Sequence, residues 1–303
     1  MTKRLRERAQ VVRTIRSFFD ARGFLEVETP SIVPSPGMDL HLDAFEVVGA
    51  GWLVTSPELH MKRLLCEGYA SIYQLGRCYR RNEQGAQHNA EFTMLEWYRA
   101  HAGMEDVLRD TEQLVAAVSG GRFVVDGRTV DAAPPFARLS VCEAFLRFAR
   151  VPAEETLAMA SADEDRFYRV LVDEIEPALA QLPHAVFLTE YPTPMASLAQ
   201  KKPGDPRVAE RFELYVAGVE LCNGFGELTD AREQRARFVA DQDARRARGL
   251  PVYVLDEKFL AALEDGDGMP ASGGNALGVD RLIALSCGTR DIESVLAFTA
   301  EET

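Results

Sequence analysis

The sequence predicts one α+β domain with a mostly antiparallel sheet flanked by helices. Apolar residues recur with helical spacing in some segments and with the two-residue period of strands in others. Two long strand pairs are each joined by a short connection, and no linker, repeat or low-complexity segment divides the 303 residues. At 47% hydrophobic and 27% charged, the chain has the composition of a soluble globular protein with a large core.

The first third is predicted to alternate between helices and strands. Apolar residues predict a helix over residues 3–22, and Gly23 suits its left-handed end. FLEVETP is typical of a short strand, and WLVT at 52–55 of a buried strand. In TSPELHMKRLL a Thr or Ser cap and Pro57 mark the start of a helix that Gly68 ends.

Hairpins and helices account for the rest of the chain. SIYQLGRCYR and EFTMLEWY form a long antiparallel hairpin around the loop 81–90, and RFVVDGRTV is a hairpin with a type I′ turn. RFELYVAGVELCNGFGELTD returns to strands, and GGNALG is a strand or glycine-rich turn. Helices are predicted over residues 103–118, 140–148 with a Ser140/Glu143 capping box, 162–181, 231–248, from Asp256, and from near Gly278.

Bulk properties favour a cytoplasmic enzyme or binding protein. The formal charge of −13 opposes broad attraction to nucleic acid, so no stable tRNA or DNA binding is expected. The five cysteines show no C-x-x-C pair, which favours reduced thiols. The first residues lack a secretory pattern, and no run could span a bilayer, so no membrane association is expected.

Glu96 occupies an unusual position in the returning strand of the first hairpin. A two-residue period places Phe92, Met94, Glu96 and Tyr98 on one face. A buried carboxylate there needs a cation or good hydrogen-bond donors, and no Lys or Arg shares that face. We therefore expect the cation to come from outside the chain.

The same hairpin could hold a nucleotide. Arg80 closes one strand, Glu83 and His88 lie in the loop, and Phe92 opens the returning strand. A guanidinium group binds phosphate in a bidentate manner, and an aromatic face can stack on a purine. The alternative is a surface hairpin with a core phenylalanine and solvated charges.

Two carboxylates, Glu213 and Glu220, are candidate magnesium ligands. Seven residues apart, they would lie on opposite faces of a regular strand, and converge only through a bulge, bend or turn near Ala217 and Gly218. Converging carboxylates suit Mg²⁺ bridged to phosphates. The alternative is a solvated strand edge.

In GGNALGVDRL, small residues precede a helix that carries Arg281 in its first turn. They permit close approach of the backbone to a ligand, although Arg281 could equally pair with Asp280 or a neighbouring acid. No G-x-S-x-G motif or Walker loop indicates a nucleophilic mechanism or a P-loop.

The order and wording of these segments resemble the three signature motifs of class II aminoacyl-tRNA synthetases, most closely the lysine-specific branch. Motif 1 corresponds to about residues 3–31, motif 2 (YRRNEQGAQHNAEFTMLEWY) to about 71–99, and motif 3 (GNALGVDRLIAL) to about 273–287. The resemblance covers the chain nearly end to end, residues 1–303, and implies a single synthetase-like catalytic domain. It also implies a homodimer, because motif 1 forms a dimer interface in this superfamily.

Motif 1 begins within a few residues of Met1, so no N-terminal OB-fold domain for anticodon reading is expected. ELxNGFxELTDA and GxALGVDRL resemble the truncated paralogues that attach lysine or β-lysine to a lysine of elongation factor P. The implied activity is ATP-dependent formation of an acyl-adenylate and its transfer to that protein. The alternatives are a catalytically silent module that senses an amino acid, and a synthetase fragment with tRNA or a small molecule as acceptor.

The resemblance also implies residue roles. Arg80, Glu83, His88, Phe92 and Arg281 would bind ATP, with Arg80 and Arg281 at the reacting phosphates, and Glu213 and Glu220 would hold Mg²⁺. Glu58 would meet the amine nearer the carboxylate, and Glu96, Tyr98 and Glu227 the distant ammonium, which would be the cation that Glu96 lacks. Cys222, Asn223 and Phe225 would line the amino-acid pocket.

Two positions depart from the family pattern. Ala90 replaces the proline of H-N-P-E-F, and Cys222 stands where relatives have glycine or alanine. The larger Cys222 side chain is expected to reshape the pocket. The residues leave L-lysine and (R)-β-lysine both open as substrates.

Overall fold

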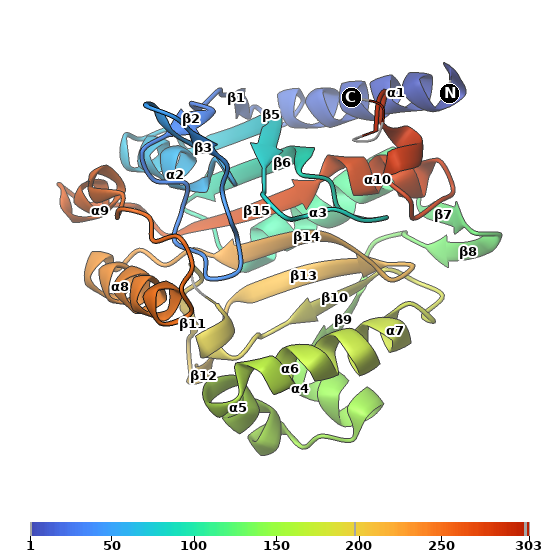
Figure 1. The fold of residues 1–303 in the computed structure, drawn as a ribbon. Coiled ribbons are helices and arrows are strands. Elements are labelled where there is room, and N and C mark those ends of the chain that lie inside the picture. Colours follow the sequence, from blue (N-terminus) through green and yellow to red (C-terminus); the bar gives the residue numbers. More distant parts are fainter. Residues whose placement is uncertain (1, 197, 300–301, 303) are drawn as a thin grey trace.

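An eight-stranded sheet forms the centre of the protein, which was analysed as a computed structural model that describes residues 2–196, 198–299 and 302. The strands lie in the order β1-β5-β6-β15-β14-β13-β10-β9 (Figure 1). The two outermost pairs, β1 with β5 and β9 with β10, are parallel, and the neighbours between them are antiparallel. The prediction of a mostly antiparallel sheet is confirmed. The strands are β1 (Leu25–Glu26), β5 (Ser71–Tyr79), β6 (Glu91–Ala100), β9 (Ala137–Ser140), β10 (Val186–Thr189), β13 (Arg211–Val216), β14 (Val219–Gly226) and β15 (Ser272–Gly278).

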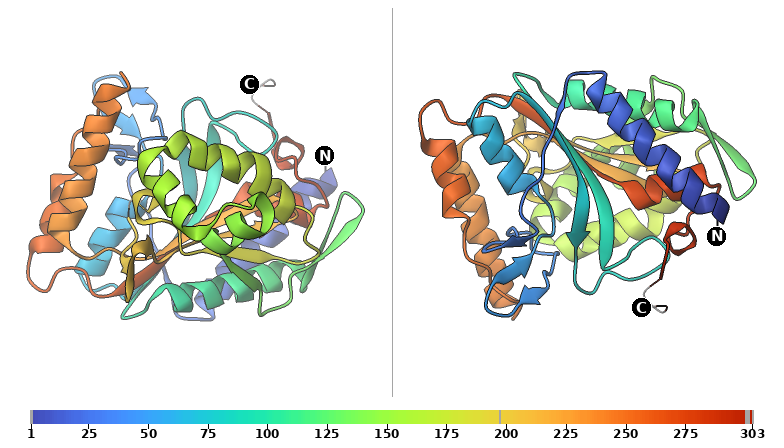
Figure 2. Two further views of the ribbon diagram at one scale, coloured as in Figure 1. Left: turned by 90° about the horizontal axis from the view of Figure 1, so that it is seen from below. Right: turned by 90° about the horizontal axis from the view of Figure 1, so that it is seen from above.

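Helices cover both faces of the sheet (Figures 1 and 2). Alternating strand residues are divided between the two faces, as Phe187 and Val186 of β10 and Leu95 and Tyr98 of β6 belong to different apolar clusters. The first face packs against α1 (Thr2–Asp20), α3 (Met104–Ser119) and α10 (Val279–Ser286). The second face carries two groups: α2 (Glu58–Cys66), α8 (Ala231–Ala247) and α9 (Glu257–Glu264), and then α4 (Val141–Ala144), α5 (Ala153–Ala162), α6 (Glu164–Val170) and α7 (Glu176–Leu179).

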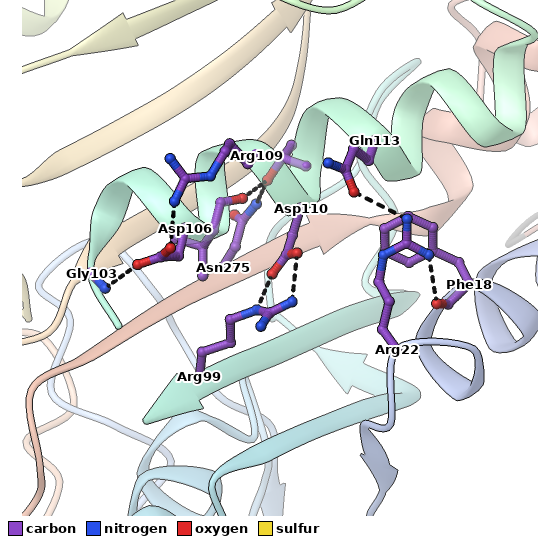
Figure 3. A network of polar contacts seen from close by, with 11 residues as sticks. Phe18, Arg22, Arg99, Gly103, Asp106, Arg109, Asp110, Gln113 and Asn275 are labelled. Atoms are coloured by element: carbon purple, nitrogen blue, oxygen red, sulfur yellow. Dashed lines mark hydrogen bonds and ion pairs between the residues drawn. The ribbon is translucent and has the colours of Figure 1, made fainter. Parts of the chain in front are cut away.

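Polar contacts fix α3 to the sheet (Figure 3). Arg99 of β6 makes a bidentate ion pair with Asp110 of α3, at 2.6 and 2.9 Å. Asn275 of β15 donates to the hydroxyl of Thr111 at 2.7 Å. Asp106 accepts from the backbone N–H of Gly103, which caps the helix. This side of the sheet is therefore rigidly supported.

Local sequence signals explain many helix and turn boundaries. Ser140 and Glu143 form the expected capping box, and Asp256 accepts from the N–H of Phe259 at the start of α9. Asp126 and Gly127 both have positive φ, as a type I′ turn requires. Ser56 accepts from the N–H of Glu58 at the start of α2.

Several expectations need correction. The segment 52–55 belongs to a small separate sheet of β2 (Ile32–Val33), β4 (Gly51–Leu53) and β3 (Glu46–Val47), and its strand is only half-buried. The helix expected over 162–181 is α6, a π-helical turn (Leu171–Ile175) and α7. Helix α5 was missed because few of its residues are buried, so its apolar periodicity is weak. Strand β9 and the pair β11 (Lys201–Lys202) and β12 (Asp205–Ala209) were also missed.

The described residues contain neither a disulfide nor a helix that could span a membrane. No disulfide joins any of the five cysteines. Within the part of the chain that the structure describes, no helix has the length and apolar character to cross a membrane. The other elements are the hairpin of β7 (Arg122–Val125) and β8 (Arg128–Asp131), a second π-helical turn (Phe145–Ala149), and two 3₁₀ turns (Thr193–Met195 and Glu293–Val295).

Candidate active site

A cavity of about 480 Å³ opens on the second face of the sheet. Its floor comes from β6, β14 and β15, and its walls come from the loop after β2, the start of α2 and the loop between β5 and β6. One end is rich in guanidinium groups and the other in carboxylates. The two ends suit different parts of a substrate.

At the first end, Arg80 and Phe92 form a paired surface. The guanidinium carbon of Arg80 lies 5.0 Å from the centroid of the Phe92 ring, and Nη1 lies 3.7 Å from Oε1 of Glu83. Nε of Arg80 points to the carbonyl of Thr55 at 3.4 Å. All four residues line the cavity, so the hairpin is part of its wall and not a solvated surface feature.

Arg281 of α10 reaches across to the loop between β5 and β6. It donates to the carbonyl of Gln87 at 3.1 Å, to the carbonyl of Glu220 at 2.8 Å, and approaches Nε2 of His88 at 2.7 Å. A guanidinium group only donates, so Nε2 of His88 accepts and the ring is neutral. Burial, reinforced by the charge of Arg281, lowers the pKa of His88 and favours this neutral form.

Asp280 does not pair with Arg281, and the acid that lies near Arg281 is Glu220, at 3.6 Å from Nη1. Its Oδ1 atom lies 2.5 Å from Nη1 of Arg8, and its Oδ2 atom accepts from the N–H of Thr93 at 2.7 Å. Asp280 therefore joins helices α1 and α10 to β6. Arg281 is left facing the cavity.

Glu213 and Glu220 converge because the β13–β14 hairpin turns at Ala217 and Gly218, both at positive φ, and its register shifts between Leu214 and Tyr215. The bulge or turn expected there is confirmed. Glu213 is buried, so a solvated strand edge is excluded.

The two carboxylates have different surroundings. Oε1 of Glu213 lies 2.5 Å from Nη2 of Arg211, and Oε2 accepts from the hydroxyl groups of Tyr215, at 2.8 Å, and Tyr191. Glu213 lies behind the residues that line the cavity. Glu220 lines the cavity, and its nearest cationic atom is Nη1 of Arg281 at 3.6 Å. Burial and the neighbouring charge of Glu213 raise the pKa of Glu220 to about 7.

Magnesium fits Glu220 better than Glu213. Glu220 borders the cavity with Nη1 of Arg281 3.6 Å away, so a divalent cation bound there would supply further positive charge. Both oxygens of Glu213 already have partners within the protein. The described residues contain no cluster of three or more metal-ligating side chains, so substrate oxygens and water would complete the coordination of Mg²⁺.

At the second end, a lysine of the protein lies among the carboxylates. Lys62 of α2 has no exposed surface; its Nζ atom lies 2.6 Å from Oε1 of Glu58 and in direct contact with Oε2 of Glu227. Burial alone would lower the pKa of Lys62, but the two carboxylates raise it. These ion pairs involve Glu58 and Glu227 and not Glu96, so the expectation that the cation for Glu96 comes from outside the chain stays a prediction.

Glu96 is buried beside this pair and is held by neutral donors. The hydroxyl of Tyr98 donates to Oε1 at 2.5 Å, and the hydroxyl of Ser56 donates to Oε2 at 2.9 Å. Burial and the charge of Glu58 raise the pKa of Glu96 to about 7. Burial raises that of Glu227 to about 8, although Lys62 opposes the shift.

Asn223 and Phe225 complete this wall, and the ring of Phe225 lies 6.0 Å from Nζ of Lys62. Cys222 also borders the cavity, but its buried side chain belongs to the apolar cluster on the first face of the sheet. Asn223 accepts from Nε of Arg211 at 3.1 Å. Burial raises the pKa of the Cys222 thiol, which keeps it protonated.

A comparison with known proteins identifies the family. The family model described as tRNA synthetases class II (D, K and N) matches residues 1–302. The chain belongs to this family. It is 43% identical to the elongation factor P–(R)-beta-lysine ligase of Proteus mirabilis (strain HI4320) over 320 residues, which cover 97% of this chain and 94% of that protein. It is 44% identical to the protein of the same name from Edwardsiella ictaluri (strain 93-146) over 316 residues, covering 98% and 95%.

The class II membership accounts for the arrangement of the three motif segments. Motifs 2 and 3 pair directly, since β6 and β15 are neighbours, and motif 1 supplies α1 and β1 at one edge of the sheet. Contact between Arg281 and the loop residues Gln87 and His88 brings the expected ATP-binding residues of motifs 2 and 3 together.

Two glycines in motif 3 lie closely against the protein's own residues. A side chain at Gly274 would overlap the ring of Tyr98 and Oε1 of Glu227, and one at Gly273 would lie 2.5 Å from the carbonyl of Gly103. The close approach is thus to the protein's own residues. Because Gly274 has no side chain, Tyr98 and Glu227 can pack directly against its backbone.

Sequence reasoning missed two charged residues at the site. Lys62 follows Glu58 by four positions on one helix, and this spacing alone predicts a contact. Arg211, which holds Glu213 and Asn223 and lines the cavity, is brought there by strand pairing, and no spacing rule indicates it.

Proposed function

We propose that this protein uses ATP to activate (R)-β-lysine or lysine as an acyl-adenylate and transfers the acyl group to a lysine side chain of elongation factor P. One observation carries the proposal: a single cavity is lined at one end by Arg80, Phe92 and Arg281 and at the other by Glu58, whose carboxylate pairs with the buried Lys62. The names of the two relatives, which align over nearly the whole chain, supply the amino acid and the acceptor.

Activation requires one bond to form and one to break at the α-phosphorus of ATP. A carboxylate oxygen of the amino acid attacks the phosphorus, and pyrophosphate leaves in line. Arg80 is suited to hold the α-phosphate and Arg281 the leaving phosphates, while the Phe92 ring stacks on adenine. Neutral His88, held by Arg281, and Glu83 bound to Arg80 would place the loop over the nucleotide.

Mg²⁺, when bound, supplies positive charge to the phosphate oxygens. Glu220, which lines the cavity, is suited to hold it. Glu213 is the neighbouring carboxylate and lies further from the cavity. Arg211 fixes Glu213 and so shapes the surface that Glu220 presents.

Charge counting supports a diamino acid as substrate. Glu58, Glu96 and Glu227 contribute three carboxylates, and Lys62 contributes one ammonium group, so the fully ionised cluster has two negative charges in excess. Lysine and β-lysine each carry two ammonium groups, which balance this excess. Both isomers carry the same charge, so the choice between them depends on where the nearer amine meets Glu58.

Transfer completes the reaction. The neutral amine of the acceptor lysine attacks the acyl carbonyl, an amide bond forms, and AMP leaves with the electrons of the broken acyl–phosphate bond. No enzyme nucleophile takes part, which agrees with the lack of a nucleophile motif in the sequence. This chemistry belongs to the cytoplasm, where elongation factors act.

ATP–pyrophosphate exchange with purified protein tests the first step. We expect exchange with (R)-β-lysine or L-lysine and none with amino acids that carry a single amine. Mass spectrometry of elongation factor P after incubation with the active amino acid, ATP and Mg²⁺ then tests transfer to the protein. No exchange with any amino acid would favour the silent sensing module. Exchange followed by labelling of total tRNA on filters, without labelling of the protein, would favour the tRNA acceptor.

The expected homodimer has a specific structural counterpart. β1 is an edge strand of the main sheet, and Leu25 in this strand and Ile32 just beyond it expose about half of their surface. A second copy would cover them. Light scattering at micromolar protein should give the mass of a dimer, and the mass of a monomer would refute this part of the proposal.

A further inference from the structure

Arg245 is a buried arginine on α8 outside the three family motifs. Its side chain has no exposed surface, and its guanidinium carbon lies 4.6 Å from the centroid of the Tyr253 ring. Burial of a charge is costly unless the charge is paired and fully hydrogen-bonded. The partners of Arg245 therefore show what it is there to hold.

Nε of Arg245 donates to the carbonyl of Pro251 at 2.6 Å, and the other partners belong to the cavity loop, which we define as residues 36–43. Arg245 donates from Nη1 to the carbonyls of Asp39 at 2.7 Å and Leu42 at 3.0 Å, and from Nη2 to Oδ1 of Asp43 at 2.7 Å. Residues 36–42 all line the cavity but form no helix or strand. Without a strand or helix ladder, the carbonyl groups of this loop that face the protein must find other partners, and one guanidinium group supplies several.

Asp43 continues the connection to the motif 2 loop, residues 81–90. Its carbonyl accepts from the N–H of Arg81 at 2.7 Å, and its Oδ2 atom lies 3.4 Å from Nδ2 of Asn82 and 3.8 Å from Nη2 of Arg81. Arg80, which faces the expected phosphate position, is the preceding residue. A continuous set of contacts thus runs from Arg245 through Asp43 to the start of the nucleotide loop.

We propose that Arg245 is a positioning residue: through Asp43 it holds the cavity loop and the motif 2 loop in one arrangement. Loss of this connection lets both loops move, so binding must first restore the competent arrangement and affinity falls by the fraction of molecules that lack it. The reacting groups themselves are unchanged. The effect is therefore expected on KM more than on kcat.

The test uses Arg245→Lys and Asp43→Asn, with Asp110→Asn as the matched control. Lysine keeps the charge but is a compact donor that cannot span the acceptors of a planar guanidinium group. Asp110→Asn weakens a bidentate arginine–aspartate pair of the same kind on the opposite face of the sheet (Figure 3), far from the two loops. It should lower the melting temperature without affecting either loop.

Two readouts are needed, because the kinetic one rests on the proposed function. In ATP–pyrophosphate exchange, both test variants should raise KM for ATP by about fivefold or more and change kcat by less than about twofold. The backbone N–H of Ala44 donates to the hydroxyl of Tyr253, and the N–H of Arg81 donates to the carbonyl of Asp43. In both test variants these two N–H groups should exchange with solvent about tenfold faster than in the unmodified protein.

Unchanged exchange at Arg81 in Asp43→Asn would overturn the inference, whether or not the protein is catalytically active. A parallel fall in melting temperature with unchanged KM in both test variants would also overturn it, since that is the behaviour expected of Asp110→Asn. Absence of pyrophosphate exchange in the unmodified protein would instead count against the proposed function alone.

Discussion

Nζ of Lys62 lies 2.6 Å from Oε1 of Glu58, and both residues belong to α2. The same ammonium group contacts Glu227, which comes from the far end of β14. The buried carboxylate cluster thus contains a cation of the protein's own.

Replacement of Lys62 by methionine should destabilise the protein strongly. Glu58 and Glu227 would lose their buried partner, and breaking a buried pair in this way costs about 3–5 kcal/mol. Denaturant unfolding measures the effect. Lys202→Met, which removes an exposed pair with Glu190, should cost less than about 1 kcal/mol. A similar small cost for Lys62→Met would show that the cluster does not depend on Lys62.

The stability of the empty protein should fall as pH rises through the neutral range. The pKa values of Glu96 and Glu227, about 7 and 8, lie above the ordinary carboxyl value near 4.3. Between these values the folded protein binds more protons than the unfolded chain, so its stabilisation is complete below about pH 4.3 and is lost by about pH 8. Melting temperatures from pH 5 to 8.5 test this, and Glu96→Gln should reduce the slope.

Binding of the amino acid should show the opposite dependence on pH. Two substrate ammonium groups require ionised carboxylates, so KM for the amino acid should fall as pH rises from 6 to 8. Calorimetry in buffers of different ionisation enthalpy should detect release of protons on binding. KM that stays constant over this range in the unmodified protein would contradict the assignment of Glu96 and Glu227 to the substrate.

Arg281→Lys should reduce the rate of pyrophosphate exchange by about 100-fold or more, because loss of a preorganised donor to a charged transition state has effects of this size. Lysine keeps the charge but not the planar set of donors that reaches Gln87, His88 and Glu220. Arg290→Lys, at an exposed arginine paired with Asp126, is the control and should be neutral. Equal rates for the two variants would remove Arg281 from the reaction.

Glu220→Gln should raise the Mg²⁺ concentration needed for half-maximal exchange by about fivefold or more, since a neutral amide is a weaker ligand for a hard cation. Titration of Mg²⁺ at fixed ATP measures the shift. Glu174→Gln on an exposed face should leave the curve unchanged. An unchanged curve for Glu220→Gln would exclude Glu220 as the metal-facing carboxylate.

Gly274→Ala should impair the amino-acid end of the cavity selectively. The added methyl group would overlap Tyr98 and Glu227, and overpacking of this kind costs about 1–3 kcal/mol. KM for the amino acid should rise more than KM for ATP. Gly103→Ala, where a methyl group meets nothing within 4 Å, is the matched control. Equal changes in both KM values would indicate general loss of structure instead.

Local signals in the sequence predicted the elements that frame the site. Two-residue alternation predicted the hairpin of β5 and β6, and helical spacing predicted the helix that begins after Gly278. Ala217 and Gly218 were named as the place where the next hairpin could turn, and both have positive φ. Family resemblance then gave residues that the structure places around one cavity: Arg80, Phe92, Arg281, Glu220, Glu58, Asn223 and Phe225. Their chemical roles stay predictions that the measurements above test.

Other features of the site were decided by packing between distant segments. Glu213 was predicted as a metal ligand, but Arg211 and two tyrosines occupy its oxygens. Asp280 pairs with Arg8, which lies 272 residues earlier in the chain, and not with its neighbour Arg281. Neither outcome could be inferred from neighbours in the sequence.

The sequence by itself determined the alternation of strands and helices, the antiparallel hairpins and the order of the motifs, because these depend on residues close together in the chain. Only the tertiary structure decided that Lys62 also contacts Glu227, and that Arg245 holds a loop some 200 residues earlier. The physical reason is that burying a charge is costly, so each buried charge takes whichever partner the fold brings within reach.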